Sequence, residues 1–219
     1  MSKEDFYDFI VIGSGFGGSV SALRLVEKGY RVLLLERGPR FKDKDFTENG
    51  LAFKKLLWFP SLKSRGPYQV SMFRNVVVQH GSGVGGGSLV YGNVLMEPDE
   101  HVFQNAHWTA AGIENWKSTL KPHFKRIKEI MGATPSPPFK KEDNYREFSE
   151  SIIPFGTPET LHVAVSFEEE KETEKSAHMS ACKMCGGCMA GCRYGAKRTL
   201  SKNYLYRAEK LGVAIRPDS

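Results

Sequence analysis

The chain has 219 residues, of which 40% are hydrophobic and 26% charged, with a formal net charge of +6. These values are ordinary for a globular protein and argue against a disordered chain. The basic residues are spread along the sequence, so we expect no nucleic-acid binding. We expect a cytoplasmic protein without a transmembrane segment. The N-terminus has acids where a secretory signal is basic, and no run reaches the roughly 18 to 20 apolar residues of a membrane span.

The first elements predicted along the chain are a strand, a helix and a second strand. Residues 7–12 form an apolar run that ends at a glycine, which predicts a buried strand. Residues 19–28 have apolar positions spaced by three, which is typical of a helix, and Gly29 ends it. Residues 31–35 predict another buried strand. Because all three lie within about 30 residues, the two strands should be parallel.

The next stretch alternates between loops and short elements. Residues 39–50 are polar and predict a loop, whereas residues 51–59 are rich in large apolar side chains and predict a short helix. Residues 75–79 predict a strand. This strand leads into residues 80–88, where five of nine positions are glycine.

The second half of the chain begins with a helix predicted over residues 116–131, whose apolar residues share one face. Residues 139–180 are charge-rich and predict long loops, with a strand near residues 161–167. A helix over residues 201–211 and a strand over residues 213–216 are predicted to follow the cysteine-rich part of the chain.

The first glycine motif has the spacing of a dinucleotide site. Gly13, Gly15 and Gly18 occupy the three positions of G-x-G-x-x-G, directly after the first predicted strand. The pyrophosphate of a dinucleotide would then lie on the N-terminus of the following helix. Glu36 ends the second strand, where its carboxylate can accept hydrogen bonds from ribose hydroxyls. The same carboxylate disfavours the 2′-phosphate of NADP, which leaves FAD and NAD.

The second glycine run distinguishes between these two cofactors. Glycine backbone lets a large planar ring lie directly against the chain. The stretch GSGVGGGSLVYGN (81–93), together with GSGFGGSVSALRLVEKGYRVLLLERG (13–38), resembles the glucose–methanol–choline (GMC) oxidoreductases and their bacterial cholesterol-oxidase-like branch. The resemblance is firmest over residues 7–132 and 181–217. It implies non-covalently bound FAD and oxidation of a small-molecule alcohol or sterol by hydride transfer to the flavin. Electrons would then pass to O2 or another acceptor.

The resemblance also assigns cofactor contacts to individual residues. Asn93 would provide a polar group near the isoalloxazine, because Tyr91 stands where family members often have asparagine. The whole set assigned to FAD is Gly13, Gly15, Phe16, Gly17, Gly18, Glu36, Arg37, Gly83, Gly86, Gly87, Ser88, Asn93 and Val94.

The fold class that we expect is α/β. It would be a Rossmann-like FAD-binding domain of the GMC type, incomplete at its C-terminus, with parts of a substrate-domain insertion. Residues 1–138 would form the FAD-binding region and residues 139–180 an irregular linker or lid. Residues 181–219 would carry the cysteine motif and a helix and strand that return to the FAD sheet. The resemblance places the catalytic histidine further along the family's sequence, so we expect an N-terminal portion without that base.

Four cysteines form a separate motif. Cys182, Cys185, Cys188 and Cys192 have the spacing C-x-x-C-x-x-C-x-x-x-C of ferredoxin iron–sulfur ligands, although Arg193 replaces the usual proline. Such a cluster in a reducing compartment suggests metal or redox work. Zinc and purely structural cysteines remain open as well. An iron–sulfur cluster would give flavin electrons a route out of the enzyme.

Three function classes therefore remain open from the sequence. The chain would belong to an FAD-dependent alcohol or sterol oxidoreductase, an NAD-binding dehydrogenase, or an iron–sulfur-linked electron-transfer module. Flavin absorbance would exclude the second class, and iron with acid-labile sulfide would support the third. We predict no catalytic residue, because His101, His107 and His123 have no visible partner and the resemblance places the catalytic histidine further along the family's sequence.

Overall fold

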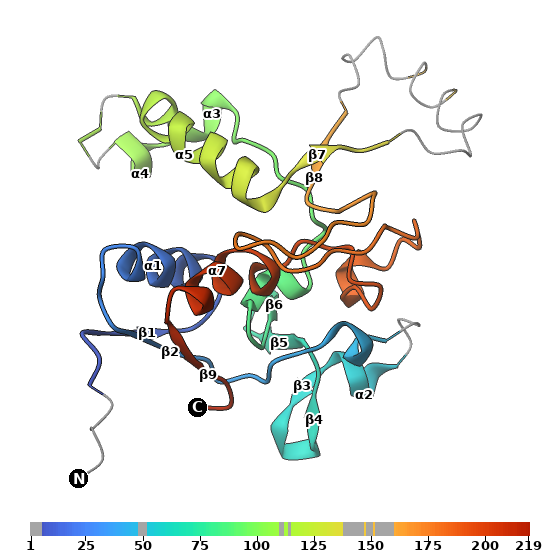
Figure 1. The fold of residues 1–219 in the computed structure, drawn as a ribbon. Coiled ribbons are helices and arrows are strands. Elements are labelled where there is room, and N and C mark those ends of the chain that lie inside the picture. Colours follow the sequence, from blue (N-terminus) through green and yellow to red (C-terminus); the bar gives the residue numbers. More distant parts are fainter. Residues whose placement is uncertain are drawn as a thin grey trace. The chain divides into compact units, whose positions relative to one another are not determined.

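The computed structural model describes residues 6–47, 52–109, 112–113, 115–137, 147, 151 and 160–219 (Figure 1). The chain divides into two compact units, one made of Met1–Asn93 with Val165–Ser219 and the other of Val94–Ala164. The first half of the linker or lid predicted over residues 139–180 lies outside the described residues, except for residues 147 and 151. The domain boundaries drawn from the sequence stay a prediction.

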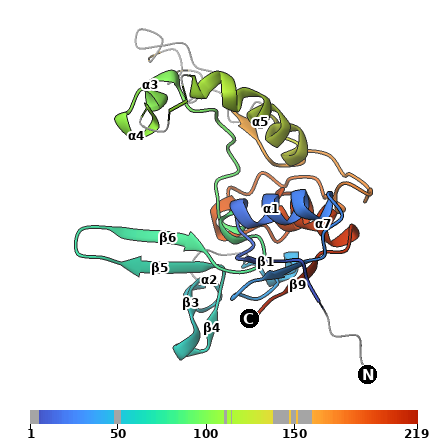
Figure 2. The same ribbon diagram turned by 90° about the vertical axis from the view of Figure 1, so that its left-hand side faces the viewer.

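The first unit is built on a three-stranded parallel sheet with the order β1-β2-β9. β1 (Phe9–Ile12) pairs with β2 (Val32–Leu35), and β2 pairs with β9 (Ala214–Arg216). Helix α1 (Phe16–Val26) connects the first two strands, so the predicted strand–helix–strand unit with parallel strands is confirmed. Helix α7 (Tyr204–Lys210) packs beside α1 on the same face of the sheet (Figures 1 and 2).

The core of this unit lies between the sheet and the two helices. Leu34 of β2, Leu23 of α1 and Leu205 of α7 are fully buried. β1 differs from β2 because it forms an edge of the sheet. In the described part of the chain no strand pairs with its outer side, and Ile12 is 86% exposed.

The remainder of the first unit consists of short elements between the sheet strands. Residues 51–59 were predicted as one short helix, but only part of this stretch is helical and its end is a strand. The strand predicted over residues 75–79 is present with its bounds moved by two residues, and it forms a hairpin that leads into the glycine run (Figure 2). These elements are η1 (Asp43–Asp45), α2 (Phe53–Leu56), β3 (Trp58–Phe59), η2 (Pro60–Leu62), β4 (Ser64–Arg65), β5 (Tyr68–Met72), β6 (Val77–Gly81), η3 (Gly86–Leu89), η5 (Cys188–Ala190) and η6 (Leu200–Lys202).

The second unit is mainly helical. Helix α5 (Trp116–Met131) has the bounds predicted from the sequence. The Asn115 side chain caps its start by accepting a hydrogen bond from the Ser118 amide, and Gly132 ends it in the left-handed conformation. The strand predicted near residues 161–167 is shorter than expected. The other elements are α3 (Glu100–Phe103), α4 (Ala106–Thr109), β7 (Thr134–Pro135) and β8 (His162–Val163).

Among the residues that the structure describes, no helix combines the length and the apolar character needed to cross a bilayer.

Candidate cofactor site

The first glycine turn joins β1 to α1 and leaves the start of the helix open. Gly13 has a φ of 88°, which favours glycine. A Cβ at Gly18 would lie 1.9 Å from the Gly13 carbonyl oxygen, so this glycine permits close packing of helix on strand. In contrast, a Cβ at Gly15 or Gly17 would meet nothing within 4 Å. No side chain caps the helix at Gly15 and no acid lies in its first turn. Its free backbone amides therefore suit an anionic group.

The carboxylate of Glu36 is buried beside this turn. Its Oε2 accepts hydrogen bonds from the Ser14 amide at 3.0 Å and the Ser14 hydroxyl at 2.6 Å, and its Oε1 accepts one from the Gly38 amide at 2.9 Å. A carboxylate has about four acceptor positions. With three of them filled by the chain itself, about one remains for a ribose hydroxyl, and the predicted ribose contact stays a prediction.

The second glycine run, residues 81–88, lies directly against the first turn. The Ser14 hydroxyl accepts a hydrogen bond from the Gly85 amide at 2.9 Å. A Cβ at Gly86 would lie 2.7 Å from a backbone Cα of the first turn, and a Cβ at Gly38 would lie 2.4 Å from the Gly83 nitrogen. The backbone of the first turn, of the second glycine run and of Gly38 therefore meets without intervening side chains. Such close approach requires glycine at these positions. The structure brings the two glycine motifs together in one site.

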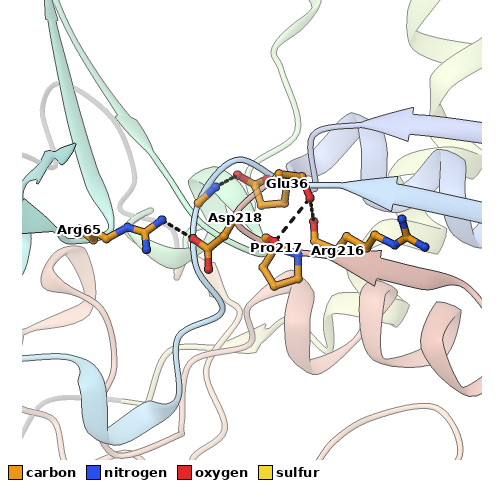
Figure 3. Close-up of polar contacts among 7 residues, drawn as sticks. Glu36, Arg65, Arg216, Pro217 and Asp218 are labelled. Atoms are coloured by element: carbon orange, nitrogen blue, oxygen red, sulfur yellow. Dashed lines mark hydrogen bonds and ion pairs between the residues drawn. The ribbon is translucent and has the colours of Figure 1, made fainter. Parts of the chain in front are cut away.

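The backbone around Glu36 is held by the last residues of the chain (Figure 3). The Glu36 amide donates to the Arg216 carbonyl at 2.9 Å, and the Glu36 carbonyl accepts from the Ser219 amide at 3.1 Å. Asp218 forms an ion pair with Arg65 at 2.5 Å (Figure 3). These hydrogen bonds hold the backbone at the end of β2 through both the amide and the carbonyl of Glu36. They therefore restrict the direction in which the Glu36 side chain leaves the backbone.

Two buried polar atoms in the second glycine run and just beyond it have no hydrogen-bond partner. They are Asn93 Oδ1 and Ser82 Oγ. Asn93 is 6% exposed and has a φ of 57°. A buried hydrogen-bond acceptor that has no donor within the chain indicates that a donor is missing from its surroundings. By contrast, Ser88 is satisfied within the chain, because its hydroxyl donates to the Gly85 carbonyl and accepts from the Leu200 amide.

The other predicted cofactor residues are placed less centrally. Phe16 lies at the start of α1, and its ring meets the Tyr91 ring edge-on at 5.9 Å. The exposed Arg37 guanidinium donates a hydrogen bond to the half-buried Gln69 side chain. Val94 begins the second unit. Like the rest of the set assigned to FAD, the assignments of Phe16, Gly17, Arg37, Gly87 and Val94 stay predictions.

Sequence reasoning missed Ser14, which bonds Glu36 through its amide and hydroxyl and accepts a hydrogen bond from the Gly85 amide. Its only signal was a small hydroxyl residue between Gly13 and Gly15, and that signal does not reveal a partner at Gly85. The C-terminal contacts to Glu36 were missed too, because they are made by backbone atoms and have no side-chain signature.

The four cysteines are free thiols. Among the described residues, no three His, Cys, Asp or Glu side chains are grouped so that they could hold a metal ion. The Cys182 sulfur instead accepts a hydrogen bond from the Met184 amide at 3.3 Å. This arrangement does not fit an iron–sulfur or zinc ligand set. A metal role for Cys182, Cys185, Cys188 and Cys192 stays a prediction from their spacing.

Two titratable groups in the region of the cysteines have shifted pKa values. Burial raises the pKa of the Cys188 thiol, although the nearby Lys197 ammonium acts in the opposite direction. Burial also raises the pKa of Glu170, but hydrogen bonds from Ser166 and Arg198 outweigh it, and the pKa of this carboxyl falls below its usual value. The Glu170–Arg198 ion pair is thus a local stabilising contact.

Comparison with known proteins extends these observations. Residues 7–218 match the family model described as GMC oxidoreductase. Cholesterol oxidase of Acinetobacter baumannii is 38% identical over 95% of this chain and 39% of its own length. Cholesterol oxidase of Mycobacterium tuberculosis (strain ATCC 25618 / H37Rv) is 39% identical over 96% of this chain and 38% of its own length. The chain thus spans about two fifths of the length of these curated relatives.

A solved structure supports the fold. Pyridoxine 4-oxidase from Mesorbium loti superposes with a TM-score of 0.59 and 19% sequence identity, covering 97% of this chain and 42% of that one. At this identity the likeness shows the fold alone. It agrees with the predicted α/β class and with the parallel βαβ unit at the N-terminus.

Proposed function

The chain belongs to the GMC oxidoreductase family, and from this premise we propose that it is the FAD-binding portion of an FAD-dependent oxidoreductase that acts on the CH–OH group of an alcohol or sterol. One observation carries the proposal: two glycine motifs about 70 residues apart meet around Ser14 and the buried Glu36. Two relatives named cholesterol oxidase support a sterol or another alcohol as the substrate.

The residues present fit an FAD molecule. The uncapped start of α1 offers backbone amides to the pyrophosphate, and Glu36 has an acceptor position left for a ribose hydroxyl. The second glycine run offers bare backbone to a planar ring, and Asn93 Oδ1 offers an unused acceptor to a ring N–H group. Bound FAD supplies the acceptor for a hydride from the substrate carbon. The chain itself binds and orients the cofactor and keeps water from the buried carboxylate.

The electron acceptor is a finer part of the proposal. The names of the two relatives support O2 as the acceptor. The cysteine spacing alone favours an iron–sulfur cluster, and the described residues bring no metal-ligand group together there, so we propose no electron transfer through it. NAD is the less favoured cofactor, because a nicotinamide dinucleotide gives no role to the second glycine run.

Titration of the purified chain with FAD tests the proposal. We expect quenching of flavin fluorescence and a shifted flavin absorbance band, with no comparable binding of NAD. Glu36→Gln should weaken FAD binding by about tenfold, because a hydrogen bond to a charged group contributes about 1.5–3 kcal/mol. Glu209→Gln is the matched control, since Glu209 is a surface residue paired with Arg40.

The same preparation tests the alternatives. Binding of NAD with no binding of FAD would show that the proposal is wrong. Iron and acid-labile sulfide in anaerobically purified protein, lost in the Cys185→Ser variant, would establish the cluster as a second redox centre.

A further inference from the structure

Lys197 is a lysine whose ammonium is buried inside the first unit. Its exposure is 1%, and it is among the largest fully buried side chains. Lysine is almost never buried to this degree without a partner, because its charge loses the solvation of water. Burial lowers the pKa of Lys197 to about 8, against the influence of Cys188 and Cys192. A position this unfavourable for a cation needs specific contacts to hold it.

The ammonium is held by two carbonyl oxygens and an aromatic ring. Its Nζ donates to the Cys188 carbonyl at 2.7 Å and to the Leu89 carbonyl at 3.1 Å. It also lies 4.6 Å from the centre of the Tyr91 ring, within the range of a cation–π interaction. None of these partners is a carboxylate, so the contacts serve to join segments of backbone and not to form an ion pair.

The partners of Lys197 come from two segments that are distant in the sequence. Cys188 lies in η5, within the cysteine segment, residues 182–192. Leu89 ends η3, directly after the second glycine run, and Tyr91 follows two residues later. The Tyr91 ring also meets Phe16 of the first glycine turn edge-on, and its hydroxyl donates to the Arg198 carbonyl at 2.9 Å. One ammonium therefore connects the cysteine segment to the end of the second glycine run.

We propose that Lys197 is a positioning residue of the FAD site, which fixes the second glycine run and Tyr91 to the cysteine segment. This inference rests on the proposed function. It gives the cysteine segment a role that needs no metal: the segment supports the backbone on which the cofactor lies. Because coupling between two sites is reciprocal, FAD binding must in turn restrain the cysteine segment.

The first test measures this coupling in the unchanged chain. The thiols are modified with an aromatic disulfide reagent, with and without saturating FAD. We expect FAD to slow the modification of the partly buried thiols, including Cys188, at least threefold, whereas the exposed Cys185 reacts at an unchanged rate. An FAD-bound chain whose partly buried thiols react as fast as in the free chain would overturn the inference.

The second test uses Lys197→Met, with Lys202→Met as the matched control. Lys202 lies in η6 and pairs with Asp43 at 2.8 Å, and within the described residues its ammonium forms no hydrogen bond with the second glycine run. We expect Lys197→Met to weaken FAD binding at least tenfold and to abolish the protection of the thiols, and Lys202→Met to do neither.

The outcomes separate the two proposals. Unchanged FAD affinity and unchanged protection in Lys197→Met would overturn this inference while the proposed function stands. If Lys197→Met does not fold, the thiol protection in the unchanged chain decides. A chain that binds no FAD at all would overturn the proposed function and this inference with it.

Discussion

Gly18→Ala tests the packing on which the first glycine turn depends. The new Cβ would lie 1.9 Å from the Gly13 carbonyl oxygen and 3.3 Å from a methyl group of Val11. A contact with a backbone oxygen cannot be relieved by a side-chain rotation, so helix α1 must move away from β1 by about 1 Å. Overpacking costs about 1–3 kcal/mol, and a 1.9 Å contact with a backbone oxygen places this case at the upper end, about 3 kcal/mol, of which alanine returns about 1 kcal/mol through its higher helix propensity.

We therefore expect Gly18→Ala to lower the free energy of unfolding by about 2 kcal/mol. For a chain of this size the midpoint of thermal unfolding should fall by roughly 4–8 °C, measured by circular dichroism. Gly17→Ala is the matched control one residue earlier, where a Cβ meets nothing within 4 Å. This variant should unfold at the same or a slightly higher temperature, because it gains helix propensity without a clash. Equal midpoints for the two variants would refute the reasoning.

Three further predictions concern single contacts. Ser14→Ala leaves the Gly85 amide without its acceptor and should weaken FAD binding by roughly tenfold in calorimetric titration; unaltered affinity would contradict the bridging role. Asn115→Ala removes the cap of α5 and should reduce the free energy of unfolding by about 1 kcal/mol, measured in urea. The pKa of Glu170 is lowered in the fold, so its pairing with Arg198 stabilises the chain above the unfolded-state pKa and is lost as the pH falls through the folded-state pKa. Acid unfolding should therefore begin at a higher pH for Arg198→Gln than for the unchanged chain, and coincident curves would speak against this pairing.

Helices and strands were predicted best where the sequence pattern depends only on neighbouring residues. The bounds of α5 followed from its apolar spacing. The hairpin strand β6 begins two residues later than predicted, because Phe73 and Val76 close the turn that precedes it. The stretch after Leu51 was predicted as helix from apolar content alone, and that content does not separate the helix α2 from the strand β3 that follows it.

The candidate site was predictable only within each motif. Spacing identified Gly13 and Glu36, but no local pattern could show that Ser14 joins them to a residue 71 positions away. The cysteine spacing could not reveal the path of the backbone either. Met184 and Gly186 adopt left-handed conformations, with φ of 52° and 70°, and such backbone angles decide where the neighbouring sulfur atoms point.

The shared hydroxyl of Ser14 has a consequence for protein engineering. A chimera that takes its first nucleotide-binding turn from another member of the family would keep the local strand and helix intact. It would nevertheless lose the acceptor for the Gly85 amide unless the donor sequence also has a hydroxyl at this position. The two glycine motifs therefore form one exchangeable module, even though the chain between them contains four strands of other sheets, β3 to β6. Cofactor specificity should be transplanted by replacing residues 13–18, 36–38 and 81–88 together.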